Sequence, residues 1–439
     1  MREGWVFSTV GEIIAADGGE IKTGPFGTTL KASEYAGHGV PLISVGEVGN
    51  GKINVHPKTP RVSPITTARL PEYVLRAGDI VFGRKGAVER SALVSVEQDG
   101  WFLGSDGIRL RLPKAYDARF ACLWMQSASH KEWIQRNATG STMASLNQKI
   151  ISRIPIPLPP LTEQRAIAAT LGALDDKIEL NRKMNETLEA MARALFRDWF
   201  VDFGPTRAKM AGTTPYLSPA LWSLFPDRLD YAGKPEGWEL FHLGQIAEHH
   251  TKTLTPERMA AVDVEHFSLP AFDKGQIPAL DAGATIKSNK TLVPAEAVLL
   301  SKLNPEIPRI WMPETQSGLQ QVSSTEFLAF TAKAGAGRCL LFCLFSDQGF
   351  RAMLHGMVTG TSKSHQRISP PSLLRRYVIT GTLELFGAFE ESAAPLLERV
   401  RANRAESRTL AQTRDLLLPC LMSGELRVAS ADKNIETAA

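Results

Sequence analysis

The feature that most constrains the fold is a stripe of heptad-spaced residues that occurs twice in the chain. The first copy consists of Leu174, Ile178, Asn181, Asn185, Leu188, Ala192 and Leu195. The second consists of Leu396, Val400, Asn403, Ser407, Leu410, Arg414 and Leu417, each 222 residues later. Matching seams of this kind predict two long helices that pack along each other as a coiled coil, with the polar positions setting the register. The alternative is two independent amphipathic helices, each packed on its own domain.

The residues around the first stripe predict a helix from Glu163 to Phe200. Four prolines between residues 155 and 160 keep the chain extended before it, and Thr162 is a good N-cap. The helix would end before Gly204, and Gly424 would follow the second helix. At the usual rise such a helix is about 57 Å long. We therefore expect it to act as a spacer.

Shorter repeats flank the two stripes. The stretch "GWVFSTVGEI" from Gly4 matches "GWELFHLGQI" from Gly237. Similarly, "GSDGIRLRL" from Gly104 parallels "SSTEFLAF" from Ser323, and "ATGST" from Ala138 parallels "VTGTS". Short alternating strands and short helices lie between these motifs, which is typical of the α+β class. The sequence thus predicts two pseudo-repeated α+β domains, each followed by a long helix.

The expected organisation has six segments. They are a first domain at 1–158, a helix at 159–203, a proline-rich linker at 204–236, a second domain at 237–385, a second helix at 386–428 and a disordered tail at 429–439.

Composition narrows the cellular setting. No run of 18 apolar residues and no secretory signal is present, which argues against a membrane span. Four scattered cysteines suit a reducing cytoplasm, where we expect the protein to reside. The balance of 50 Lys and Arg against 46 Asp and Glu permits nucleic-acid binding without requiring it.

The chain has no recognisable catalytic motif. A phosphate-binding GxxxxGK[ST] loop is missing. Cys339 and Cys343 have no second pair of ligands at zinc spacing and are interpreted as core thiols. The Asp175-Asp176-Lys177 run lies within the heptad stripe and is interpreted as a solvated helix face. We therefore expect no catalytic residue, no metal and no bound cofactor.

Polar loops at corresponding places of the two repeats are the candidate binding sites. Lysine and arginine neutralise phosphates, while arginine, asparagine and glutamine pair with base edges. The candidates in the first copy are Lys22, Lys31, Arg84, Lys85, Arg90, Ser141, Thr142, Asn147 and Lys149. Those in the second are Lys287, Lys290, Thr361, Lys363, His365, Gln366 and Arg367. Ordinary solvated surface is the alternative for each loop.

These motifs together resemble those of the specificity subunits of type I restriction–modification systems. The strongest match is "PLPPLTEQRAIAATLGALDDKIELNRKMNETLEAMARALFRDWFVDFGPTRAKMAG", which is similar to the central conserved region of that family. "LRAGDIVFGRKGAVERSALV", "TGSTMASLNQKIISRIPIPLPPL" and "GTSKSHQRISPPSLL" resemble motifs of its target-recognition domains. The helix "LLERVRANRAESRTLAQTRDLLLPCLMSGELRV" is similar to the distal conserved region.

The resemblance implies a non-catalytic adaptor that binds double-stranded DNA. Two target-recognition domains, separated by two long antiparallel coiled-coil helices, would each read one half of a bipartite, asymmetric target. The helices would dock two modification (methyltransferase) subunits and, through them, restriction subunits, so that S-adenosylmethionine, ATP and Mg²⁺ would belong to the partners. The second copy has no match to "FGRKGAVER", so we expect different half-sites. A modification-only system and a coiled-coil scaffold for proteins are the alternatives.

Overall fold

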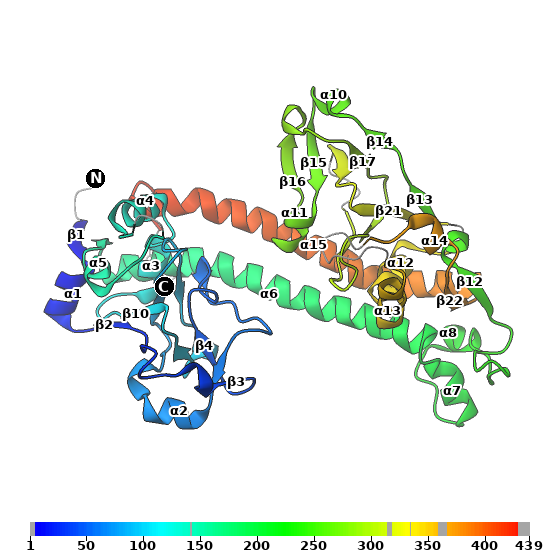
Figure 1. Cartoon of the computed structure of the whole chain (residues 1–439), viewed down its shortest axis with the longest axis horizontal. Coiled ribbons are helices and arrows are strands. Elements are labelled where there is room, and N and C mark those ends of the chain that lie inside the picture. The colour runs from blue at the N-terminus through cyan, green and yellow to red at the C-terminus, as the bar shows by residue number, and fades with distance from the viewer. Residues whose placement is uncertain (1–4, 141–142, 314–317, 334, 359–366, 429–439) are drawn as a thin grey trace, which may run out of the picture. The chain divides into compact units, whose positions relative to one another are not determined.

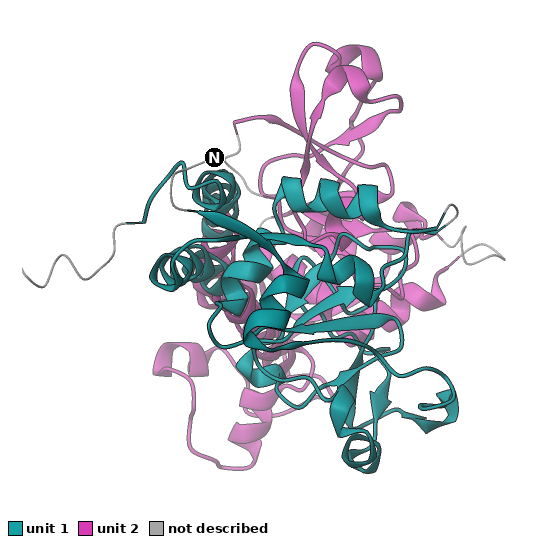
Figure 2. Ribbon diagram, turned by 90° about the vertical axis from the view of Figure 1, so that its left-hand side faces the viewer, with its two compact units in different colours: residues 1–179, 406–439 teal, residues 180–405 magenta. Residues whose placement is uncertain are grey.

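A computed structural model describes residues 5–140, 143–313, 318–333, 335–358 and 367–428. The chain forms two compact units (Figure 2). Unit 1 comprises residues 1–179 and 406–439, and unit 2 comprises residues 180–405. Each unit combines small β-sheets and short helices with part of two long helices (Figure 1). The class is therefore mixed helix and strand. No helix among the described residues is long and apolar enough to cross a membrane.

Unit 1 is built on a five-stranded sheet of order β2-β10-β7-β8-β5. Its strands are Glu20–Thr23, Gly107–Arg111, Ile80–Gly83, Ser91–Leu93 and Gly51–Lys52. A second sheet has the order β3-β6-β4-β9, with strands Tyr35–Ala36, Arg61–Val62, Val40–Ile43 and Phe102–Leu103. The strands β1 (Val6–Thr9) and β11 (Pro155–Leu158) pair with each other. The helices are α1 to α5, at Val10–Asp17, Pro64–Arg69, Ala118–Trp124, Ala128–Asn137 and Gln148–Ser152.

Unit 2 has a four-stranded sheet of order β13-β21-β18-β19. Its strands are Ala247–His250, Phe327–Ala332, Val298–Ser301 and Ile310–Trp311. A five-stranded sheet of order β14-β17-β20-β15-β16 contains Thr253–Leu254, Lys290–Leu292, Gln320–Ser323, Asp263–Phe267 and Ala279–Ala282. The strands β12 (Glu239–His242) and β22 (Tyr377–Gly381) pair. The helices α7 to α14 are Gly204–Met210, Pro219–Ser223, Leu243–Ile246, Pro256–Met259, Leu269–Asp273, Arg338–Ser346, Gln348–Gly356 and Pro370–Leu374.

The central sheets of the two units have the same strand order and pairing. The order β2-β10-β7-β8 of unit 1 corresponds to β13-β21-β18-β19 of unit 2. Gly107 pairs with Gly83, and Phe327 pairs with Ser301. This register places Asp106 and Glu326 at equivalent positions, one residue away from the alignment suggested by the sequence. Both strands are buried on both faces, so their sequences lack a clear alternation that would fix the alignment, and only the observed strand pairing determines it.

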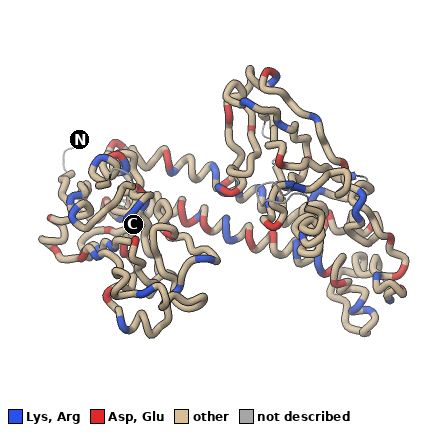
Figure 3. The backbone as a smooth tube through the Cα atoms, in the orientation of Figure 1, with Lys and Arg blue, Asp and Glu red and all other residues tan. Residues whose placement is uncertain are grey.

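The long helices are α6 (Leu161–Phe200) and α15 (Leu383–Met422), with 40 residues each. Both begin earlier than the sequence pattern suggests, so Thr162 lies in the first turn of α6 and is not its N-cap. At α15 the hydroxyl of Thr382 accepts a hydrogen bond from the amide of Leu385 (3.1 Å), which defines the start. Both long helices carry basic and acidic residues along their length (Figure 3).

Within each unit α6 and α15 contact each other and run antiparallel. In unit 2 the rings of Phe200 and Phe386 are 5.7 Å apart, and Asn181 Nδ2 donates to the carbonyl of Asn403 (3.4 Å). In unit 1 Asp175 accepts a hydrogen bond from Arg414 at 2.7 Å. The contacting residues have increasing numbers along α6 and decreasing numbers along α15, as expected for antiparallel helices.

The segment 204–236, expected as a linker, contains α7 and α8 and contributes to the core of unit 2. Phe225 is buried, and its ring lies 5.3 Å from that of Trp199. One aromatic residue in a proline-rich segment carries no periodic signal, which explains why sequence periodicity did not indicate this contact.

Candidate nucleic-acid interface

In unit 1 three polar loops meet at one end of the five-stranded sheet. We call residues 22–31, 84–90 and 139–149 loop cluster 1, excluding 141 and 142, which lie outside the described residues. The amide of Arg84 donates to the carbonyl of Asp106 (2.8 Å), and its own carbonyl accepts from Leu146 (2.8 Å). The amide group of Gln148 donates to the hydroxyl of Thr23 (3.2 Å). Backbone hydrogen bonds thus join the loops around Arg84 and Leu146, and a side-chain hydrogen bond joins Gln148 to Thr23, 125 residues away.

Arg84 occupies the turn that follows β7. Its guanidinium carbon lies 5.5 Å from the centroid of the Phe26 ring, a cation–π geometry. The Nη1 group also donates weakly to the carbonyl of Ser105 (3.5 Å). The Phe26 ring is 58% exposed, which is unusual for a phenylalanine and leaves an apolar face in solvent beside the guanidinium.

Three other cations of loop cluster 1 have carboxylate neighbours. Lys22 Nζ lies 3.8 Å from Glu20 and 5.1 Å from the ring centroid of Tyr73. Lys85 Nζ lies 3.7 Å from Asp106, and Arg90 Nε lies 4.0 Å from its neighbour Glu89. Solvent-accessible pairs of this kind contribute little to stability. These side chains can therefore exchange their carboxylate for a phosphate at small cost.

The remaining described candidates in this cluster differ in their local roles. Lys31 and Lys149 are exposed. Asn147 is the N-cap of α5, and its side-chain oxygen accepts from the amide of Ile150 (2.9 Å). That bond leaves the amide NH₂ of Asn147 as the group that can face a ligand.

Unit 2 reproduces the backbone frame of loop cluster 1. The amide of Lys302 donates to the carbonyl of Glu326 (2.9 Å), and the carbonyl of Lys302 accepts from Ile368 (3.2 Å). Lys302 is therefore the structural counterpart of Arg84. We call residues 302–309, 324–326 and 367–369 loop cluster 2.

The sequence comparison missed Lys302 because its surrounding glycines are replaced. The available signal was the match of "GDIVFGR" to "EAVLLSK" at an offset of 218 residues. The structure supports this match, since Gly78 and Glu296 both have positive φ angles, of 89° and 60°. A glutamate in a left-handed conformation is uncommon, and its presence marks a turn of the same geometry as the glycine turn.

Of the second-copy candidates that the structure describes, Arg367 belongs to loop cluster 2. Arg367 forms a bidentate ion pair with Glu326, with N–O distances of 3.1 and 2.8 Å. Thr361, Lys363, His365 and Gln366, like Ser141 and Thr142 of the first copy, lie outside the described residues.

The candidates Lys287 and Lys290 belong to the region of the five-stranded sheet of unit 2. Lys287 is exposed, and its ammonium donates to the carbonyl of Ala284 (3.3 Å). Lys290 is only 8% exposed, and its ammonium donates to the hydroxyl of Ser288 (2.7 Å). Burial lowers the pKa of Lys290 below its usual range. Lys287 is therefore better placed than Lys290 to meet a phosphate.

The heptad residues of α6 and α15 differ in how deeply they are buried. Asn181 and Asn403 are buried, and Asn403 Nδ2 donates to Asn185 Oδ1 (2.9 Å). Ala192 and Val400 are buried, while the other heptad residues are half-buried: Leu174, Ile178, Asn185, Leu188, Leu195, Leu396, Ser407, Leu410, Arg414 and Leu417. Of these, Leu188, Leu195 and Leu396 pack against the core of unit 2, and Leu417 packs against that of unit 1.

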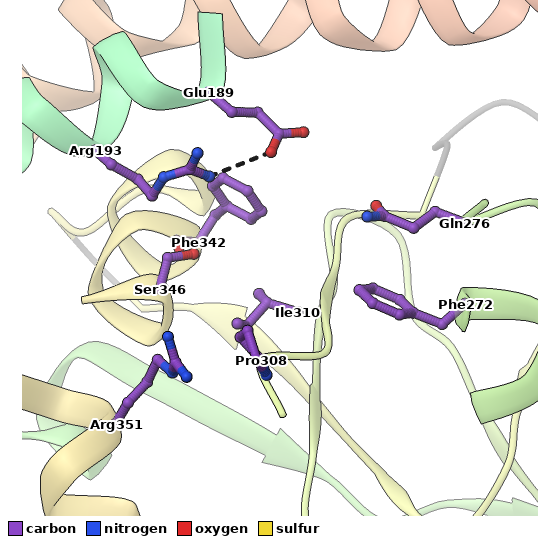
Figure 4. A pocket seen from close by; sticks show the side chains of 9 residues that line it. All are labelled: Glu189, Arg193, Phe272, Gln276, Pro308, Ile310, Phe342, Ser346 and Arg351. Carbon is purple, nitrogen blue, oxygen red and sulfur yellow. Dashed lines mark hydrogen bonds and ion pairs between the residues drawn. The ribbon is translucent and has the colours of Figure 1, made fainter. Parts of the chain in front are cut away.

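Unit 2 contains a cavity of about 280 Å³, which is lined by residues of α6, α12 and neighbouring segments (Figure 4). The carboxylate of Glu189 accepts hydrogen bonds from Arg193 (3.2 Å) and Arg404 (2.8 Å). Arg351, on the opposite wall, donates to the carbonyl of Glu306 (3.0 Å). These contacts give the arginines of the cavity a role in holding helices and a loop together.

Two features of the described residues concern chemical reactivity: the arrangement of possible metal ligands and the state of the thiols. Among them no group of three or more His, Cys, Asp or Glu side chains could hold a metal ion. All four cysteines are free. Burial raises the pKa of the Cys122 thiol to about 12 and also raises the pKa values of the Cys339 and Cys343 thiols. Thiols held protonated in this way are poor nucleophiles and poor metal ligands.

The chain is similar to known proteins over most of its length. Residues 2–190 match the family model of the type I restriction modification DNA specificity domain. The MjaIX type I restriction enzyme specificity subunit of Methanocaldococcus jannaschii is 24% identical, covering 94% of this chain and 92% of that protein. The HindI type I restriction enzyme specificity subunit of Haemophilus influenzae is 27% identical, covering 63% of this chain and 70% of that protein.

A solved structure has the same fold. The crystal structure of the type I restriction–modification S subunit from M. genitalium covers 96% of this chain and 97% of its own, with a TM-score of 0.55 and 15% sequence identity.

Proposed function

We propose that this chain, a relative of the specificity subunits of type I restriction–modification systems, reads a bipartite target on double-stranded DNA for such a system. In this role it is a non-catalytic cytoplasmic adaptor. Each unit would supply one target-recognition domain, and the two half-sites would differ in sequence.

The observation that carries this proposal is the duplicated loop frame. Arg84 and Lys302 make the same two backbone hydrogen bonds at the end of equivalent sheets, yet the side chains around them differ. A rigid frame that presents different polar side chains is suited to reading two different short sequences. The cations of both clusters supply the contacts to phosphates on which DNA binding depends.

The length of α6 and α15 suits a role in setting the spacing of the two half-sites. A helix of 40 residues spans about 60 Å at 1.5 Å per residue. We propose that α6 and α15 form an antiparallel coiled coil that determines the length of the non-specific spacer between the half-sites. Their charged outer faces would dock two methyltransferase subunits, which in turn would carry the restriction subunit and bind S-adenosylmethionine, ATP and Mg²⁺.

The decisive test is a comparison of methylation patterns. Deletion of this chain from its host should abolish one bipartite methylation motif, which sequencing of modified bases detects. Purified chain with its methyltransferase subunits should bind that motif, and the affinity should fall steeply with salt because lysines and arginines displace counterions. An unchanged methylation pattern would contradict the proposal.

The same experiments distinguish two other functions. A complex that contains methyltransferase and never cleaves unmethylated DNA would indicate a modification-only system. A chain that binds protein partners but has no salt-dependent affinity for DNA, alone or with them, would indicate a coiled-coil scaffold.

A further inference from the structure

We infer that Arg84, supported by the exposed ring of Phe26, reads a guanine in the half-site recognised by unit 1. This inference rests on the proposed DNA-reading function and deepens it. It assigns a base, a reading residue and a positioning residue within loop cluster 1.

Arg84 is held firmly at its backbone. Hydrogen bonds on both sides of the residue, to Asp106 and from Leu146, fix the turn at the end of β7. A side chain that starts from a fixed backbone loses less freedom on binding, and this favours a specific contact over a diffuse one.

The charge of Arg84 is available for a ligand. Lys22, Lys85 and Arg90 each lie within 4.0 Å of a carboxylate, whereas no such ion pair involves Arg84 among the described residues. The one side-chain hydrogen bond found for it in the described part of the chain goes to the carbonyl of Ser105. Four of its five N–H donors therefore remain for recognition.

Phe26 explains why this cation is an arginine. The ring lies 5.5 Å from the guanidinium carbon and restricts where the guanidinium group can lie. The loop carrying Phe26 is itself constrained, because an added Cβ at Gly24 would meet the carbonyl of Gly104, the residue after β9, at 1.8 Å. The exposed ring of Phe26 is thus placed beside the guanidinium, where it can support one orientation of that group.

A guanidinium held in one orientation selects guanine. The O6 and N7 atoms of guanine present two adjacent acceptors in the major groove, which match two N–H groups of one arginine. Adenine places a donor next to N7 and would leave one N–H without an acceptor. A phosphate contact, in contrast, would need neither the restricted orientation nor the aromatic support.

The equivalent position in unit 2 serves as an internal comparison. Lys302 has the same backbone contacts but carries a compact ammonium on a flexible stem. No cation–π contact involves it among the described residues. Substitution of Lys302 should therefore affect the other half-site only.

The test uses the chain assembled with its methyltransferase subunits and a DNA library in which the unit 1 half-site is randomised. With the unaltered protein we expect one position to be restricted to guanine. R84A should reduce the preference for guanine at that position by about 5- to 150-fold and leave the other positions unchanged. R84K keeps the charge and should lose most of the same preference, which separates orientation from electrostatics.

Two further variants test the role of Phe26 and control for phosphate contacts. F26L keeps an apolar side chain without the aromatic ring and should lower the guanine preference about 2- to 5-fold. K149A should weaken binding to all sequences alike and reduce the salt dependence. Assembly with the methyltransferase, followed by size-exclusion chromatography, confirms that each variant folds.

The outcomes separate this inference from the proposed function. If the unaltered complex recognises a bipartite motif but R84A and R84K keep its guanine preference, or weaken all sequences equally, the inference is wrong and the proposed function stands. A unit 1 half-site without a restricted guanine would overturn it as well. If the unaltered complex shows no sequence preference, the proposed function itself fails.

Discussion

Unit 1 and unit 2 share a backbone frame and differ in what they attach to it. In unit 1 the acidic residue at the start of the central strand, Asp106, pairs with Lys85 from the turn after β7. In unit 2 its counterpart Glu326 pairs with Arg367, which arrives from a different loop. The frame is made of main-chain hydrogen bonds, so its side chains can change without loss of the fold. The two units can thus present different surfaces on the same backbone support.

The two units also anchor the long helices differently. Around α6 and α15, unit 2 gathers aromatic rings, with Phe389 within 5.8 Å of Phe196 and 5.4 Å of Phe200. At the position 222 residues earlier, unit 1 has the smaller, aliphatic Ile167. Aromatic side chains bury more area and add ring contacts, so the anchor of unit 2 should be the stronger one.

Truncation of the matched anchors tests this difference and has the largest expected effect. F389A should lower the free energy of unfolding by about 4 kcal/mol, and I167A by about 3 kcal/mol, because both side chains are buried and leave cavities. Urea denaturation of the full chain gives the free energies, and hydrogen–deuterium exchange localises the loss to one unit. A larger loss for I167A would contradict the stronger aromatic anchor.

The buried histidine of unit 1 should make that unit sensitive to acid. Burial lowers the pKa of His130 to about 4, so protonation favours the unfolded chain, where the pKa is near 6.5. The neutral side chain is fully compatible with folding above pH 6.5, and stability should fall by up to about 3 kcal/mol as pH decreases towards 4. Unit 2 has Phe350 at the matched position, three residues after the N-cap of α13.

The variant H130F therefore places in unit 1 the phenylalanine that unit 2 has at the matched position. Urea denaturation at pH 7 and pH 4.5 should show a smaller acid-induced loss for H130F than for the unaltered chain. H130Q, a polar side chain that does not titrate, is the control for packing changes. Equal pH dependence in all three proteins would show that His130 is not responsible.

The polar contacts of the helix pair should differ in strength between the units. Asn403 is buried in unit 2, and N403A would remove a donor to Asn185 at an expected cost of about 1–3 kcal/mol. The ion pair of Asp175 with Arg414 in unit 1 is about one-third exposed, and R414A should cost less than about 1 kcal/mol. Thermal unfolding at low and high salt distinguishes the two, since salt screens only the ion pair.

Removal of the carboxylates that pair with the loop cations should have the smallest effect. The gain in DNA affinity should be larger for the stronger ion pair. E326Q frees Arg367 from a bidentate pair and should raise DNA affinity about 2- to 3-fold. D106N frees Lys85 from a single longer contact of 3.7 Å and should raise it less. Fluorescence anisotropy with the assembled complex measures both. Weaker binding of E326Q would indicate that Glu326 orients Arg367 productively.

Much of the architecture could be predicted because it depends on periodicity. The heptad spacing predicted both long helices, and the repeated Gly-Trp and Thr-Gly motifs predicted two related domains. The start of α15 was placed three residues late, since the cap by Thr382 is a local detail without a periodic pattern. The role of Phe225 in the core of unit 2 was not predicted for the same reason.

The candidate site could be predicted only in part. Basic residues near glycines indicated Arg84 and Lys85. Lys302 was missed because the strand before it, β18, shares no identical residue with β7 at matched positions and retains only its pattern of apolar side chains. Lys290 was chosen for its charge, yet its side chain is buried. Local composition reports which residues are charged and does not report which of them face solvent.

By itself the sequence determined the helices, the repeat and the absence of recognisable catalytic motifs, because each depends on residues close together in the chain. Only the tertiary structure decided which distant groups meet. Arg109 lies in an alternating strand, but its guanidinium is buried because the carbonyls of Glu72 and Val74 accept its hydrogen bonds at 2.9 and 3.4 Å. Arg84 stands over Phe26 for a comparable reason: two loops 58 residues apart are joined by sheet pairing, and no local pattern encodes that contact.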